Sequence, residues 1–147
     1  MNRKLNMILA AFLTATLALG SLAGCSEKAE KPERDYSSIV ENPNISIPGY
    51  EKLEFKAGKK KQSVSFRNPE ENTCYFRMTL ELEDDTDEDT VLWTSELIEP
   101  DEKIENIKLK KALDKGEYPA TLKYECFSLK DESPLNGSAI ELMIDVR

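Results

Sequence analysis

The chain has 147 residues, of which 20 are Lys or Arg, 28 are Asp or Glu, three are Cys and none is His. This length supports one domain with appendages and excludes a large α/β enzyme. The formal net charge of -8 argues against a nucleic-acid partner, because the phosphate backbone would be repelled. The lack of histidine excludes Ser-His-Asp and Cys-His catalysis and most zinc sites.

Residues 1–24 have the layout of a secretory signal peptide. Arg3 and Lys4 form a short basic region, and an apolar run follows from Met7 to about Leu19. This run is too short and wrongly flanked for a stable membrane-spanning helix. The sequence therefore predicts an exported, extracytoplasmic protein.

The predicted signal peptide is followed directly by Cys25, in the sequence Leu22-Ala23-Gly24-Cys25. This sequence resembles the lipobox of bacterial lipoproteins. The resemblance implies a lipid on Cys25, cleavage just before it, and anchoring to the cell membrane through the lipid alone. A plain signal peptide with an incidental cysteine is the alternative. Cleavage removes two basic residues and no acid, which leaves a net charge of -10 that anionic headgroups repel.

The remaining chain divides into residues 25–48, predicted as the lipidated cysteine and a flexible tether, and residues 49–147, predicted as the folded domain. The tether is rich in Ser, Glu, Lys and Pro and has only scattered apolar residues. In the domain, apolar and polar residues alternate in short runs separated by turn signals. The runs lie at 53–55, 64–66, 75–82, 91–93, 107–109, 122–126 and 140–146. They predict an all-β, antiparallel β-sandwich of about seven strands.

Leu113, Gly116 and Tyr118 match the L-x-x-G-x-Y corner that precedes the penultimate strand of immunoglobulin-like and fibronectin-type domains, which this domain therefore resembles. The resemblance implies an immunoglobulin-like sandwich in which Tyr118 packs across a bend at Gly116 and its hydroxyl bonds to upstream backbone. The Cys-Trp-Cys spacing of true immunoglobulin domains is absent. Pro119 suggests that full strand pairing starts only after it. A helix within residues 102–115 is the alternative to a strand followed by this corner.

Cys74 is predicted to begin the third strand and Cys126 to lie near the end of the sixth. In a sandwich of this type these strands are antiparallel neighbours, so both thiols would point into the core at one level. A disulfide, which an extracytoplasmic location favours, and two buried free thiols both remain open. A redox or nucleophilic role is disfavoured, because no histidine or CxxC motif is present to lower a thiol pKa.

Residues 83–90 place six carboxylates in eight residues. Asp85, Asp87 and Asp89 fall at positions 1, 3 and 5 of a calcium loop, but Thr90 stands where such a loop needs Gly. We favour a solvated hairpin tip over a weak calcium site. No other cofactor is predicted.

Two further surface features each have two interpretations. Lys59–Lys61 is a basic turn that favours solubility and blocks edge pairing, with contact to polyanions of the cell wall as the alternative. A second group contains four aromatic residues and favours core packing, with a carbohydrate-stacking platform as the alternative. These residues are Tyr75, Trp93, Tyr124 and Phe127.

The sequence shows no nucleophile with a base, no phosphate-binding glycine loop and no strong metal cluster. It predicts a monomeric, non-catalytic module that binds a protein or carbohydrate ligand at the cell surface and contacts the membrane only through its lipid. A proteinase inhibitor that uses the connection at residues 127–135 is one alternative. An enzyme with carboxylates or thiols converging in a pocket is another.

Overall fold

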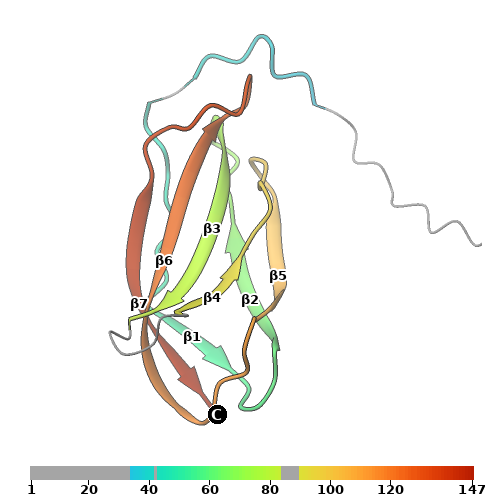
Figure 1. Cartoon of the computed structure of the whole chain (residues 1–147). Helices are drawn as coiled ribbons and strands as arrows, with labels where there is room; N and C mark the ends of the chain where they lie inside the picture. The colour runs from blue at the N-terminus through green and yellow to red at the C-terminus, as the bar shows by residue number, and fades with distance from the viewer. Residues whose placement is uncertain (1–33, 42, 84–89) are drawn as a thin grey trace, which may run out of the picture. The chain divides into compact units, whose positions relative to one another are not determined.

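The computed structural model describes residues 34–41, 43–83 and 90–147. These residues form seven strands and no helix, arranged as two sheets in an open sandwich (Figure 1). The predicted all-β class is thereby confirmed. No helix in these ranges is long and apolar enough to cross a membrane. The predicted signal peptide and Cys25 lie outside the described residues.

The larger sheet has five strands and the smaller has two. The larger contains, in spatial order, β1 (Lys52–Phe55), β7 (Ser138–Val146), β6 (Gly116–Ser128), β3 (Cys74–Leu82) and β4 (Val91–Thr94). The smaller pairs β2 (Lys61–Arg67) with β5 (Lys103–Lys108). β1 runs parallel to β7, and the other pairs are antiparallel.

The segment in which a helix was the alternative forms strand β5 and the connection to β6. Ile107 on β5 is buried in the core between the sheets. Burial of this side chain and pairing with β2 outweigh the helix propensity of the neighbouring residues, so the strand is the correct alternative.

The core lies between the sheets and follows the period-two pattern. In β3 the even-numbered side chains from Cys74 to Leu82 are buried, and the odd-numbered ones are half-buried on the outer face. β6 repeats this alternation in register with β3. The two strands thus fix which side chains enter the core and which face outward.

Pro119 limits the pairing of β6 on one side. β6 pairs with β7 from Gly116 onward but with β3 only from Ala120 onward. Proline has no N–H to donate to β3, although its carbonyl still accepts a bond from the Glu83 N–H at 2.9 Å. Pairing on both sides therefore starts after Pro119, as predicted.

The corner before β6 is built from Leu113, Gly116 and Tyr118. Leu113 is buried in the core. The Tyr118 ring lies over Gly116, so a Cβ at that position would sit 3.4 Å from the ring. The Tyr118 hydroxyl donates to the carbonyl of Asp114 at 3.0 Å. These contacts fix the direction in which the chain enters β6.

Two asparagines on the connection between β2 and β3 are buried. Asn68 is fully buried, and its amide donates to the carbonyls of Cys74 at 2.8 Å and Ile98 at 2.9 Å. The amide of Asn72 donates to Asn68 Oδ1 at 2.8 Å and to the carbonyl of Ser46 at 2.9 Å. This pair therefore ties the connection to β3, to the chain before β5 and to the segment before β1.

The compact unit extends from Arg34 to Arg147, so it includes residues that the sequence analysis assigned to the tether. The Ser46 N–H donates to Asn72 Oδ1 at 2.7 Å. The Tyr124 hydroxyl donates to the carbonyl of Pro48 at 3.1 Å, and the Ser128 hydroxyl to Glu41 at 2.7 Å. The segment before β1 is thus bound to the sandwich by hydrogen bonds to the β2–β3 connection and to β6.

We expect Asn68→Ala to lower the free energy of unfolding by about 2–4 kcal/mol, because three buried hydrogen bonds are lost and polar groups remain without a partner. Denaturant unfolding measures the change. Asn106→Ala, at an exposed position of β5, is the control and should change stability by less than about 0.5 kcal/mol. Equal stability of the two variants would contradict a stabilising role for Asn68.

Candidate functional site

The outer face of the five-stranded sheet carries a group of three aromatic residues and one arginine. Tyr75 and Arg77 project from β3, and Phe127 projects from β6. All three are half-buried. They alternate along each strand with core side chains, so they lie on the opposite, outer face of the sheet. Tyr36, from the segment before β1, joins them. We call these four residues the aromatic patch.

The two strands place Phe127 beside both Tyr75 and Arg77. Tyr75 and Phe127 are direct partners in the antiparallel register. The Arg77 guanidinium carbon lies 4.7 Å from the centre of the Phe127 ring, in cation–π contact. Arg77 also lies 4.0 Å from the Glu125 carboxylate. The arginine is therefore held flat against the sheet surface.

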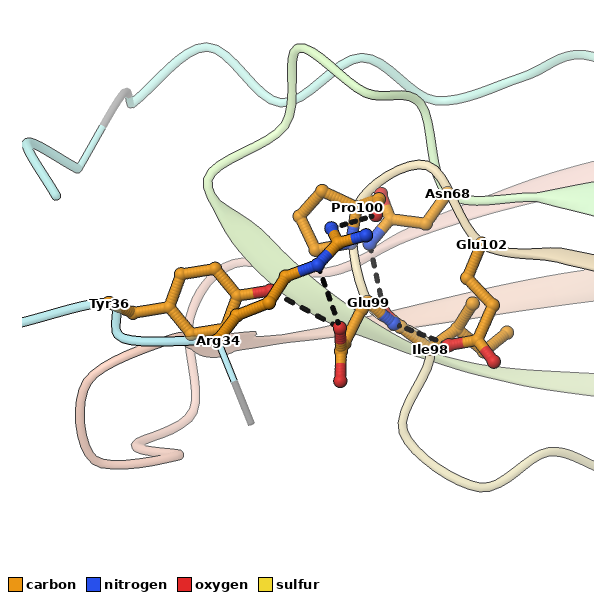
Figure 2. A network of polar contacts seen from close by, with 7 residues as sticks. All are labelled: Arg34, Tyr36, Asn68, Ile98, Glu99, Pro100 and Glu102. Carbon is orange, nitrogen blue, oxygen red and sulfur yellow. Dashed lines mark hydrogen bonds and ion pairs between the residues drawn. The ribbon is translucent and has the colours of Figure 1, made fainter. Parts of the chain in front are cut away.

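Tyr36 completes the patch from outside the sheet. Its ring meets the Tyr75 ring edge-on, with centroids 6.1 Å apart. Its hydroxyl donates to Glu99 Oε2 at 3.3 Å (Figure 2). Burial raises the pKa of Tyr36, and the nearby Glu99 carboxylate raises it further. The tyrosine therefore remains a neutral donor to this carboxylate at physiological pH.

Arg34 fastens the same segment to the connection between β4 and β5. Its guanidinium donates to the carbonyl of Pro100 at 3.3 Å and lies 3.7 Å from Glu99 Oε2. Figure 2 shows Arg34 and Tyr36 converging on Glu99 from one side, while Asn68 holds the carbonyl of Ile98 on the other. Tyr36 is thus held by its own hydroxyl and by Arg34, two residues before it.

Glu99 sits on a turn that is itself constrained. The Glu99 N–H donates to the Glu102 carboxylate at 3.0 Å, and the Glu102 N–H returns a bond to the Glu99 carbonyl at 3.1 Å. Asp101, inside the turn, has a φ of 67°. Residues other than glycine rarely adopt a positive φ. The two reciprocal hydrogen bonds between Glu99 and Glu102 therefore stabilise a turn that is otherwise unfavourable.

Elsewhere on the outer face, several charged side chains pair with one another. Lys123 on β6 pairs with Glu81 on β3. Asp145 on β7 accepts bonds from Arg147 and from Lys52, the latter at 2.7 Å. Arg147, and then Lys52, hold the pKa of Asp145 below its ordinary value. These ion pairs lie apart from the aromatic patch on the same face.

Two aromatic residues of the predicted platform are not on this face. Tyr124 is buried and packs edge-on against Phe76, with centroids 5.3 Å apart. Trp93 pairs with Leu80 in register and packs against Phe66 of the other sheet at 5.7 Å. A stacking platform of all four aromatics is therefore wrong, and core packing is correct for Tyr124 and Trp93. Only Tyr75 and Phe127 remain together at the surface.

The cysteine pair lies inside the sandwich. Cys74 and Cys126 are buried free thiols on adjacent strands. Cys74 pairs with Ser128 and Cys126 pairs with Phe76, so the two thiols are diagonal neighbours on the core face, offset by two residues. A hydrogen bond to Cys126, together with burial, raises the pKa of Cys74 well above its ordinary value. Thiolate is the reactive form, so Cys74 is a poor nucleophile in this environment.

We expect Cys74 and Cys126 to resist iodoacetamide at pH 8 in the folded chain and to react with it in unfolded chain prepared without reductant. Peptide mass spectrometry reports the modification of each residue separately from Cys25. Unmodified peptides from the unfolded chain that become modified after reduction would instead establish the disulfide. Rapid modification in the folded state would contradict the buried position of both thiols.

The candidate calcium ligands Asp85, Asp87 and Asp89 lie outside the described residues. Within the described ranges, no group of three His, Cys, Asp or Glu side chains is placed to hold a metal ion. The calcium site and the solvated hairpin tip remain the two predictions for this segment.

The connection after β6 folds back on its own strand. The Ser128 N–H donates to the Ser133 carbonyl at 2.9 Å, and the Leu135 N–H donates to the Cys126 carbonyl at 2.8 Å. Leu129 is buried, whereas Leu135 is 38% exposed. Residues 128–135 thus form a turn closed by backbone hydrogen bonds, and residues 130–135 of this turn are exposed.

Five residues that hold these contacts were not predicted from the sequence: Arg34, Tyr36, Asn68, Asn72 and Gln62. Asn and Gln between strands have the composition of turns, and their burial depends on which carbonyls the fold brings near. Arg34 and Tyr36 lie in a stretch whose polar composition is typical of a linker. The one signal that was present is the pair of aromatic and cationic side chains in that stretch.

Comparisons with known proteins add no relative. No protein-family model matches the chain, and neither a curated protein nor a solved structure matches it.

Proposed function

We propose that this chain is a lipid-anchored, extracytoplasmic binding module of immunoglobulin-like type, and that it binds a protein ligand through the aromatic patch. The observation that carries the proposal is the patch itself. It groups Tyr36, Tyr75, Arg77 and Phe127 on one sheet face. The ring contact between Tyr36 and Tyr75 and the cation–π contact between Arg77 and Phe127 hold these side chains in place. Tyr, Phe and Arg are enriched at the centres of protein interfaces.

The strand arrangement supports the immunoglobulin-like assignment. β3 and β6, at the centre of the larger sheet, face a sheet that contains β2 and β5. β1 joins the larger sheet by running parallel to β7 at its edge. The corner at Tyr118, with its hydroxyl bonded four residues upstream, matches the corner that the sequence resemblance implied.

The ring geometry favours a protein over a carbohydrate as the ligand. Sugars stack on the open faces of aromatic rings. Here the Arg77 guanidinium covers a face of Phe127, and Tyr36 meets Tyr75 edge-on. The patch instead offers ring edges, a hydroxyl and a cation, which suit the mixed polar and apolar surface of a protein.

The proposal of a lipid anchor is based on the sequence Leu22–Cys25 and can be tested directly. Cys25→Ala removes the sulfur that would carry the lipid, so we expect the chain to move from the membrane fraction to the soluble fraction of cells. Ser26→Ala is the matched control and should leave the chain in the membrane fraction. Unchanged fractionation of Cys25→Ala would refute lipid anchoring without affecting the proposal for the patch.

The patch is tested by photo-crosslinking on cells. With a benzophenone-bearing phenylalanine at position 127, we expect an ultraviolet-dependent adduct of discrete mass that contains peptide. Arg77→Ala should lower its yield several-fold, because the guanidinium no longer contributes to the interface. The same crosslinker at Ser63, an exposed position on the smaller sheet, is the control. Identical products from both positions, or an adduct that contains only glycan, would contradict a protein ligand at the patch.

A further inference from the structure

The end of the sandwich that contains the β1–β2 turn concentrates positive charge. Residues 56–61 and 108–115 contain eight lysines and one acid, Asp114. The rest of the chain contains 12 basic and 27 acidic residues. We call these eight lysines the basic end. They are Lys56, Lys59, Lys60, Lys61, Lys108, Lys110, Lys111 and Lys115.

The fold brings the two lysine-bearing segments together. Lys61 on β2 and Lys108 on β5 are direct partners in the antiparallel register. The Leu109 N–H donates to the Lys60 carbonyl at 2.8 Å, and the Gly58 N–H donates to the Leu113 carbonyl at 2.9 Å. In Figure 1 the β1–β2 turn and the chain between β5 and β6 lie at the lower end of the sandwich, near the C-terminus.

A buried glutamine fixes the turn that displays Lys59 and Lys60. The Gln62 side chain is 3% exposed and donates to the carbonyls of Lys56 at 2.9 Å and Lys59 at 2.7 Å. Its Oε1 accepts the Lys56 N–H at 2.8 Å. Gly58 supplies the φ of 66° that the turn requires. The backbone beneath these lysines is therefore rigid, while their side chains remain free to move.

The lysines face solvent with little neutralisation. Seven are exposed, and Lys111, which has a polar partner, is half-buried. Among the described residues, no ion pair joins any of the other seven to an acid. Like charges placed opposite each other, as at Lys61 and Lys108, destabilise a strand pair. The arrangement therefore opposes folding unless an anion offsets it.

Protection of strand edges does not account for this concentration. One or two lysines on β2 or β5 would block edge pairing. Lys110, Lys111 and Lys115 instead lie on the connection after β5, which presents no ladder to another chain. Lys60, Lys61 and Lys108 also border an open hollow of about 470 Å³, together with Asn106 and Ile107.

We propose that the basic end binds a linear, phosphate-rich polyanion outside the cytoplasm. Lysine is a compact charge on a flexible stem, which suits a chain of repeated phosphates better than one shaped anion. At physiological salt the screening length is about 8 Å, so acids farther away than this weaken the local attraction little. Glu83 and Asp114 line a hollow with Lys111 and offset part of its charge. The choice of a polymer over a bilayer rests on the proposed function. Arg34, the first described residue, lies beside Glu99 and Pro100, at the opposite end of β2 from Lys61.

The test uses the full chain with Cys25→Ala, in buffer without detergent, so that no lipid on the chain binds the vesicles. Three probes are compared: long-chain inorganic polyphosphate, orthophosphate, and vesicles rich in phosphatidylglycerol. We expect binding of polyphosphate that weakens steeply with salt. Replacing Lys59, Lys60 and Lys61 with Gln should weaken it at least ten-fold at 0.15 M salt. The same replacement should lower the slope of log affinity against log salt by about two, since three lysines on a single-stranded polyanion each release about 0.7 counterion.

The matched control replaces Lys103, Lys123 and Lys130 with Gln, which changes the net charge equally but lies outside the basic end. It should change polyphosphate affinity less than two-fold. Equal weakening by both variants, or no polyphosphate binding, would overturn the proposal. Binding of vesicles but not polyphosphate would replace it with a membrane surface, and equal competition by orthophosphate would replace it with a single-phosphate site. These results do not depend on membrane fractionation or on crosslinking at position 127, so failure of this proposal can be told apart from failure of the proposed function.

Discussion

The pairing of β3 with β6 is the constraint on which the rest of the structure depends. Nine consecutive residues of β3, from Cys74 to Leu82, pair in unbroken register with Ala120–Ser128. Because side chains alternate along each strand, this one register sends both thiols and Tyr124 inward and sends Tyr75, Arg77 and Phe127 outward. A shift by one residue would bury the arginine and expose the core. The aromatic patch is therefore a direct consequence of the same pairing that builds the core.

Buried side-chain amides join segments around this pairing that are distant in sequence. Asn68, Asn72 and Gln62 each bond to backbone groups on other segments, and no buried side-chain N or O among the described residues lacks a partner. Such amides stabilise connections that have no ladder of their own. The turn beneath Lys59 and the connection beneath Tyr36 are held in the same way, so both proposed binding surfaces stand on fixed backbone.

Much of the fold could be predicted because burial on one face leaves a period of two, as in β3. The strand β5 was harder, since its residues also favour helix and only Ile107 and its partner strand decide the outcome. The strand that contains Trp93 was predicted correctly. The face of the sheet on which its side chain lies depends on a register shift between β3 and β4, which the sequence does not reveal. The two sites needed long-range information. Tyr36 lies in a linker-like stretch, and the run Lys59–Lys61 gives no sign that a second lysine-rich segment lies beside it.

The two proposed surfaces differ in chemistry and lie at different ends of the sandwich. The aromatic patch includes Tyr36, which belongs to the segment through which the chain enters the domain. The basic end lies at the far end of β2, and it combines flexible charges with a rigid turn. No residue belongs to both surfaces, so the two proposals together describe one small domain with separate sites for a protein ligand and for a polyanion.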